Sequence, residues 1–144
     1  MRILGKTALP VVLALALLTA ACSGGSATPA TTTPPTSAQR IASTGTLTIV
    51  SPTNGQVIKG STVDLKVDLK GATIVPLTTT VLKPDEGHIH VSMDDQLVSM
   101  TTGTELQIPN VAPGHHLITV EFVATDHGPF DPRVLAVVSF EVKG

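Results

Sequence analysis

The sequence has one cysteine, no tryptophan, no tyrosine and only three phenylalanines in 144 residues. A single cysteine excludes a disulfide within the chain and leaves no set of thiolates for a structural zinc site. The shortage of aromatic rings argues against the stacking platforms that bind single-stranded nucleic acids. The net charge is −2, so no excess of basic side chains is present to neutralise phosphates. We therefore expect no nucleic-acid partner.

The chain also lacks an apolar run long enough to cross a bilayer. The run ALPVVLALALLTA, residues 8–20, is shorter than the roughly 20 residues that a transmembrane helix needs. Arg2 and Lys6 precede this run, and small residues follow it. A short positive start, an apolar stretch and small residues are the pattern of an export signal, which we predict over residues 1–21.

The end of the predicted signal and the cysteine that follows it read LTAAC, residues 18–22, which resembles the lipobox of bacterial lipoproteins. Leu18 lies one place further from the cysteine than in the commonest version of that motif. The resemblance implies cleavage before Cys22, acylation of its sulfur, and a mature protein anchored to a membrane and facing away from the cytoplasm. Ser23 carries no retention signal, so a host with two membranes would send the protein to the outer one. A plain secretory signal with a chance cysteine is the alternative.

Residues 22–45 are rich in Ser, Thr, Pro, Ala and Gly, with Arg40 as their one charge and Ile41 as their one large aliphatic. Such a segment buries too little apolar surface to offset the entropy of ordering it. We predict a disordered tether over residues 22–45 and one folded domain over residues 46–144.

Alternating polarity is the main structural signal in the domain. In STVDLKVDLK, residues 61–70, aliphatic residues alternate with Asp and Lys, as in a strand with one buried face. HIHVSM and QLVSM flank Asp94-Asp95 and predict a hairpin. Pro76 cannot donate to a sheet, so residues 74–82 are at best an irregular edge strand. The other predicted strands cover residues 46–50, 105–108, 115–124 and 133–142.

Seven or eight short strands separated by Gly, Pro and Asn turns, with no helical periodicity, predict an all-β domain. An immunoglobulin-like antiparallel β-sandwich fits this pattern, and a small closed barrel is the alternative. The Cys–Trp–Cys hallmark of antibody domains is absent from the sequence. No internal repeat and no second domain is expected.

Three segments, GHIHVSMDD, IPNVAPGHHLITVEF and DHGPFDPRVLAVVSFEV, together resemble an uncharacterised family of exported bacterial domains. That family carries Gly-His-x-His, then Pro-Gly-x-His, then Asp-His before the last strand. The opening LTIVSPTNGQVIKG is similar to the first hairpin of exported bacterial immunoglobulin-like modules. The resemblance covers residues 46–144 and implies the fold, but it implies no particular activity.

Histidines provide the candidate site. His88 and His90 lie two residues apart on a predicted strand, so their side chains share a face. Antiparallel pairing of residues 88–93 with 116–124 would place His88 near His127 and Asp126. Three imidazoles with a carboxylate or water suit Cu(II) or Zn(II), and we predict a metal site there. The alternative is that Asp126 and His127 only hydrogen-bond their loop to the neighbouring strand.

The other two histidines are expected to have different roles. His116 is in phase with the core residues of its strand, so we predict a structural role at the rim of the core, whereas His115 faces solvent. No G-x-S-x-G nucleophile elbow is present, and we predict no enzyme activity. The sequence therefore indicates a non-catalytic binding domain. The alternative is a module that docks onto an envelope protein or the cell wall through residues such as Leu135 and Val137, with structural histidines.

Overall fold

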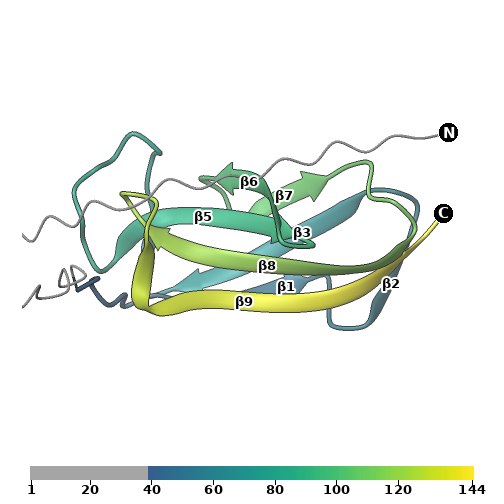
Figure 1. Ribbon diagram of the computed structural model, residues 1–144, viewed down its shortest axis with the longest axis horizontal. Helices are drawn as coiled ribbons and strands as arrows, with labels where there is room; N and C mark the ends of the chain where they lie inside the picture. The colour runs from purple at the N-terminus through teal and green to yellow at the C-terminus, as the bar shows by residue number, and fades with distance from the viewer. Residues whose placement is uncertain (1–38) are drawn as a thin grey trace, which may run out of the picture. The chain divides into compact units, whose positions relative to one another are not determined.

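The computed structural model describes residues 39–144, which form two packed β-sheets (Figure 1). One sheet has the order β1-β3-β7, and the other has the order β2-β9-β8-β5-β4, with β6 also paired to β5. The strands are β1 (Thr46–Ser51), β2 (Gln56–Lys59), β3 (Val63–Lys70), β4 (Thr73–Ile74), β5 (Glu86–Met93), β6 (Gln96–Thr101), β7 (Glu105–Ile108), β8 (Gly114–Ala124) and β9 (Pro129–Lys143). The predicted export signal, Cys22 and most of the predicted tether lie outside the described residues.

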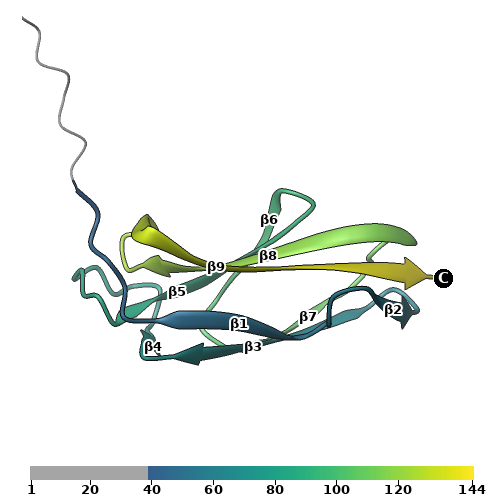
Figure 2. The same cartoon turned by 90° about the horizontal axis from the view of Figure 1, so that it is seen from below.

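The two sheets lie face to face (Figure 2), which confirms the predicted all-β, immunoglobulin-like sandwich. Two pairings depart from the expected antiparallel pattern, because β2 runs parallel to β9 and β4 runs parallel to β5. Of the irregular edge strand expected at residues 74–82, only Ile74, the last residue of β4, lies in a strand, since Pro76 interrupts the ladder. Within residues 39–144 there is no helix of the length and apolarity that a membrane span requires.

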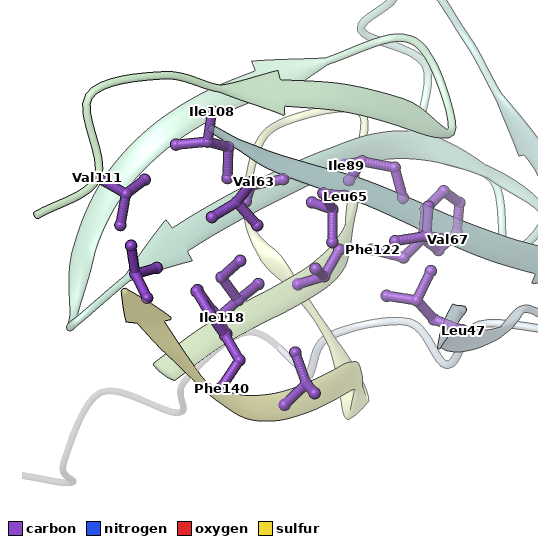
Figure 3. Close-up of a cluster of buried hydrophobic side chains, with 14 of the residues drawn as sticks. Leu47, Val63, Leu65, Val67, Ile89, Ile108, Val111, Ile118, Phe122 and Phe140 are labelled. Carbon is purple, nitrogen blue, oxygen red and sulfur yellow. The ribbon is translucent and has the colours of Figure 1, made fainter. Parts of the chain in front are cut away.

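The core lies between the sheets and contains all three phenylalanines of the chain, of which Figure 3 labels Phe122 and Phe140. The predicted alternation in β3 holds, with Val63, Leu65 and Val67 buried and the intervening charged residues turned outward. Phe122 and Ile118 of β8 belong to the same buried cluster. Burying each such side chain contributes about 1.5–3 kcal/mol, and a chain with one cysteine has no internal disulfide to add to this.

β8 is central in the larger sheet, because it pairs with β5 on one side and β9 on the other. The predicted antiparallel pairing of residues 88–93 with 116–124 is confirmed, with His88 opposite Val123 and His90 opposite Glu121. This register places the two histidines of β5 near the end of β8, where the turn into β9 begins.

Gly87 allows β5 to approach β8 closely. A Cβ atom at this position would lie 2.1 Å from the carbonyl oxygen of Val123 and 2.8 Å from the ring of Phe122. Both neighbours are fixed, one as backbone and the other as a buried core ring, so a larger residue would push the two strands apart. The glycine of GHIH is therefore a packing requirement of the sheet.

The predicted hairpin after β5 is present. Asp94 and Asp95 both have positive φ angles, 51° and 65°, as the two central residues of a type I′ turn do. Asp is one of the residues that tolerates this left-handed backbone. The turn returns the chain along β5 as β6, at an edge of the larger sheet.

The sandwich begins earlier than the predicted boundary at Thr46. Ile41 packs against the core, and its carbonyl oxygen accepts a hydrogen bond from the Asp131 amide at 3.0 Å. Thr44 donates its hydroxyl to the Gly71 carbonyl at 2.6 Å and its amide to the Pro84 carbonyl at 3.0 Å. The predicted tether therefore extends too far toward the C-terminus, because composition alone could not show that Ile41 has a partner in the core.

We predict that a fragment of residues 39–144 is more stable than a fragment of residues 46–144 by about 1–3 kcal/mol, since the longer one keeps the Ile41 contact and the hydrogen bonds of Thr44. Urea denaturation of both fragments measures the difference in the free energy of unfolding. Ile41→Ser in the longer fragment should reproduce part of the loss, whereas Val57→Ser, at an exposed valine, should not. Equal stability of the two fragments would show that the boundary at Thr46 was right.

Candidate functional site

His88 and His90 project from β5 on the side away from the core, as their alternation with Ile89 and Val91 requires. His88 is nevertheless fully buried. Its Nδ1 lies 3.2 Å from the carbonyl oxygen of Val75, in the segment that follows β4. The sequence prediction placed both rings on a polar face, and it did not foresee that this irregular segment would cover one of them.

The two nitrogens of His88 differ in their partners. A carbonyl oxygen can only accept, so Nδ1 carries the proton that it donates to Val75. Nε2 of a neutral His88 then carries a lone pair. This atom is buried and has no hydrogen-bond partner among the described residues. A buried acceptor without a partner costs about 1–3 kcal/mol, which makes Nε2 an unusual atom in this fold.

His127 lies in the turn between β8 and β9 and comes back to meet the two histidines of β5. Its Nδ1 is 3.3 Å from Nε2 of His90, and one of these nitrogens donates a hydrogen bond to the other. Its ring centroid is 4.7 Å from that of His88 and 5.5 Å from that of His90. His88, His90 and His127 therefore form one group of neighbouring rings, which we call the histidine cluster.

The backbone of His127 is held in an uncommon conformation. Its φ angle is +61°, and its amide donates to the Ala124 carbonyl at 2.9 Å to close the turn. Positive φ is uncommon for residues other than glycine, although histidine is among those that adopt it more often. The left-handed backbone is the local feature that turns this residue back toward β5, and a strained residue at a cluster of titratable groups suggests a functional site.

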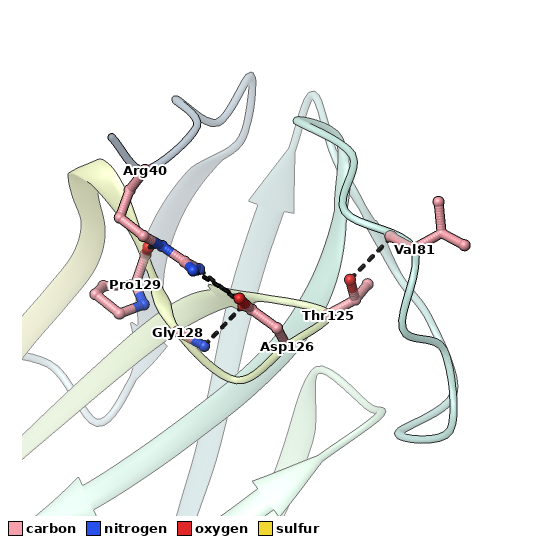
Figure 4. Close-up of polar contacts among 6 residues, drawn as sticks. All are labelled: Arg40, Val81, Thr125, Asp126, Gly128 and Pro129. Atoms are coloured by element: carbon pink, nitrogen blue, oxygen red, sulfur yellow. Dashed lines mark hydrogen bonds and ion pairs between the residues drawn. The ribbon is translucent and has the colours of Figure 1, made fainter. Parts of the chain in front are cut away.

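Asp126 does not join the histidine cluster. Both of its carboxylate oxygens accept from the guanidinium of Arg40, at 2.6 and 2.7 Å, and one also accepts from the Gly128 amide (Figure 4). Hydrogen bonds from Arg40 hold the pKa of Asp126 well below its usual range. Arg40 also donates to the Pro129 carbonyl. Asp126, predicted as a metal ligand, is thus bound by a residue of the predicted tether. The sequence did not indicate that Arg40 would be its partner.

Burial lowers the pKa of His90 from its ordinary value, and the neighbouring His127 lowers it further, while Glu121 opposes the shift and His88 adds to it. The effect of Glu121 is limited because its carboxylate is paired with Arg133, at 2.7 and 2.5 Å. His90 is therefore mainly neutral near pH 7, which is the form that can bind a metal ion.

The histidine cluster is not a finished metal centre. Within residues 39–144, no group of three or more His, Cys, Asp and Glu side chains is already arranged to hold an ion. Two nitrogens, one from His90 and one from His127, lie close enough to share one ion. The unpartnered Nε2 of His88 belongs to the same group of rings and is a third candidate donor.

A groove of about 340 Å³ lies beside the histidine cluster, on the outer face of the larger sheet. His90 lines it together with Glu121 and Arg133, and Leu135 and Val137 of β9 complete its apolar side. Leu135 and Val137 are 42% and 51% exposed, so this face is partly apolar and open to solvent.

His116 lies apart from the cluster and has partners for both nitrogens. Nδ1 is 2.7 Å from a carboxylate oxygen of Asp94, and Nε2 is 2.8 Å from the carbonyl oxygen of Ala112. The other oxygen of Asp94 accepts from the Leu117 amide at 2.9 Å. These contacts join the β5–β6 turn to the start of β8. His115 is exposed.

No protein-family model matches the chain, and no curated protein sequence matches it. Among solved structures, the fibronectin(III)-like modules of Clostridium thermocellum CbhA superpose with a TM-score of 0.48 at 21% identity, over 67% of this chain and 94% of that one. The PKD domain of human KIAA0319 gives 0.43 at 16% identity, over 84% and 91%. The endo-beta-1,4-mannanase from Thermotoga petrophila gives 0.45 at 15% identity, over 69% of this chain and 20% of the mannanase. Similarity at this level is shared by proteins of unrelated function.

The pairing of His116 with Asp94 predicts a pH dependence of stability. The hydrogen bond to Asp94 raises the pKa of His116 above 6.5, so this stabilisation is complete below pH 6.5 and is lost as the pH rises through the folded value. Hydrogen bonds from the Leu117 amide and from His116 lower the pKa of Asp94 below 3.8, so its contribution is present above pH 3.8 and is lost as the pH falls through the folded value. The pair therefore stabilises the fold most between these limits.

Urea denaturation at pH 5.5 and pH 8.5 tests this pairing. We expect the advantage of the parent over Asp94→Asn to shrink by about 1 kcal/mol or less at the higher pH, because solvent screens the half-exposed carboxylate. Asp95→Asn is the control, since Asp95 has the same left-handed backbone and its carboxylate makes no hydrogen bond to His116. The same pH dependence in Asp94→Asn as in the parent would contradict the assignment.

Proposed function

We propose that this chain is a lipoprotein anchored at Cys22, whose sandwich is a non-catalytic domain that binds Cu(II) or Zn(II) at the histidine cluster. The observation that carries the metal proposal is the contrast between the two ring nitrogens of His88. Its Nδ1 donates to a backbone carbonyl, and its buried Nε2 has no partner among the described residues. Metal-binding histidines commonly donate their second nitrogen to a carbonyl or carboxylate in this way.

The distance between the other two donors supports the same proposal. Two nitrogens bound to one tetrahedral ion at about 2.0–2.1 Å each lie roughly 3.3 Å apart. Nε2 of His90 and Nδ1 of His127 are 3.3 Å apart. Imidazole nitrogens suit Zn(II) and Cu(II), and the domain has no thiolate that would favour Cu(I). A water molecule or a group from the groove would complete the ion's coordination.

The contacts of His116 support a non-catalytic domain. The Asp94–His116 pair resembles the orienting half of a hydrolytic triad, in which the second nitrogen must be free to take a proton from a nucleophile. Here that nitrogen, Nε2, is 2.8 Å from the Ala112 carbonyl and donates to it. The histidine with the best-oriented carboxylate is therefore in no position to act as a general base.

Calorimetric titration of the 39–144 fragment with Cu²⁺ and with Zn²⁺ tests the metal site. We expect one ion per chain for the parent, and about tenfold or more weaker binding for His90→Ala and for His127→Asn, which keeps a residue that accepts positive φ. His115→Ala, at an exposed histidine outside the cluster, should bind as the parent does. Binding should also weaken at pH 5, where protons compete for the imidazoles.

A His90→Ala fragment that binds either ion as tightly as the parent would contradict the metal proposal. Loss of binding in His115→Ala alone would do the same, by placing the ion elsewhere.

The lipid anchor is tested on the full-length chain in a bacterial host. The mature protein should begin at an acylated Cys22, seen by mass spectrometry, and should remain with the membranes after a high-salt wash. Cys22→Ser should reduce the membrane-bound fraction by about tenfold, because the acyl chains supply most of the binding free energy. Recovery of the parent as an unmodified, soluble exported protein would favour the plain secretory signal instead.

A second candidate function is favoured by the outer face of the larger sheet. Leu97, Leu117, Leu135 and Val137 are each at least 40% exposed there, beside the groove. Exposed aliphatic residues that adjoin one another suit a protein partner in the envelope. In that case the histidine cluster would be structural, and the titrations would show no binding of either ion.

A further inference from the structure

A second surface lies in the segment between β4 and β5, whose first residue, Val75, also contacts His88. This segment, residues 75–85, is attached to the beginning of the described chain. The Pro84 carbonyl accepts from the Ser43 hydroxyl and from the Thr44 amide, both at 3.0 Å. Figure 2 shows the two segments at the same end of the sandwich, with the C-terminus at the other end. We call residues 75–85 the end loop.

The end loop exposes three large aliphatic side chains. Val81 is 64% exposed, Leu82 is 45% exposed and Leu77 is 40% exposed. The loop is held in this position from beneath, because the buried Thr125 donates its hydroxyl to the Val81 carbonyl at 2.9 Å. Figure 4 shows the Val81 side chain directed away from Thr125. The Val81 side chain is thus directed outward from a hydrogen-bonded backbone position, and Leu77 and Leu82 are exposed on the same loop.

The charged residues beside these aliphatics are largely paired within the domain. Lys83 contacts Glu86 at 2.6 Å, and Arg40 is bound to Asp126. These pairs leave Asp85 as the remaining charged residue of the loop. An apolar surface could therefore approach the loop without stripping water from an isolated lysine or arginine, and the approach would depend little on salt.

The number of residues between Cys22 and the described chain limits how far the end loop can lie from the anchor. Cys22 is 17 residues before Gln39, so the anchor lies within about 60 Å of the start of the described chain. Of the two ends of the sandwich, the one carrying the end loop is the one joined to that chain. A tether of this length keeps the loop at high effective concentration near the anchoring membrane, so a weak contact suffices.

We propose that Leu77, Val81 and Leu82 of the end loop contact the bilayer that holds the Cys22 acyl chains, at the boundary between headgroups and acyl chains. This proposal rests on an anchor at Cys22 and is independent of metal binding. It orients the sandwich with its N-terminal end toward the lipid and its C-terminal end away from it. Aliphatic side chains on a fixed loop drive the contact, so anionic lipid is not required.

The chain has no tryptophan or tyrosine, which allows one introduced tryptophan to report its own surroundings. The mature chain from Cys22 to Gly144, with Val81→Trp, is anchored in phosphatidylcholine vesicles either by its natural acyl chains or by coupling its thiol to a maleimide lipid. Val57→Trp is the matched control, since Val57 is 49% exposed on β2, at the end of the sandwich that carries the C-terminus. Spin-labelled lipids in the vesicles act as quenchers.

We expect emission from the Val81→Trp chain to shift to shorter wavelength and to fall roughly twofold or more with the quencher, while the Val57→Trp chain behaves as in water. Adding Leu82→Ser to the Val81→Trp chain should reverse much of the quenching, and adding Leu97→Ser, at an exposed leucine of β6, should not. Circular dichroism establishes that each variant is folded.

Several results would overturn the proposal. Equal quenching of the two tryptophan variants would do so, and so would the absence of quenching in both. Quenching that requires anionic lipid would indicate a charge-driven contact, and a shift that rises with protein density at constant lipid would indicate that the loop meets a second copy. Failure of natural lipidation appears separately, as loss of flotation with vesicles. The thiol-coupled chain still tests the end loop in that case.

Discussion

The close approach of β5 to β8 at Gly87 is the constraint on which the histidine cluster depends. A side chain there would collide with the Val123 carbonyl and the Phe122 ring, so the two strands can pair at this register only with glycine. The pairing places His88 beside the last residues of β8, a few residues before the turn that carries His127. Sheet register, core packing and site geometry are therefore consequences of one contact.

The same end of the sandwich gathers three segments that are far apart in the sequence. Residues 40–44 bind the β8–β9 turn through Arg40 and the end loop through Thr44. The end loop in turn covers His88 through Val75 and contacts Thr125 through Val81. Displacing the N-terminal segment would remove contacts from both the turn and the loop that surround the cluster. Attachment of the chain and the histidine site are physically linked in this way.

Much of this arrangement follows from sequence patterns, and the remainder has a physical reason for being missed. Alternation in β3 and β5 predicted the strands, and antiparallel pairing predicted that His127 would lie near His88. Burial of His88 was missed because residues 75–85 have no periodicity, so nothing in them indicates which face they cover. The contact of Arg40 with Asp126 joins residues 86 apart in the sequence. It was not predicted because Arg40 lies in a Ser-, Thr- and Pro-rich segment whose composition indicates disorder.

The two groups of histidines show why satisfied and unsatisfied nitrogens have different meanings. His116 has an acceptor for each nitrogen and connects two turns, so its contacts fully account for its position. His88 is fully buried and leaves one nitrogen without a partner among the described residues, next to a histidine on a left-handed backbone. An unpartnered buried acceptor costs about 1–3 kcal/mol, and a left-handed backbone at a residue other than glycine costs about 1–2 kcal/mol. A ligand that binds all three rings would offset both, which is why the cluster and not His116 is the place to look for one.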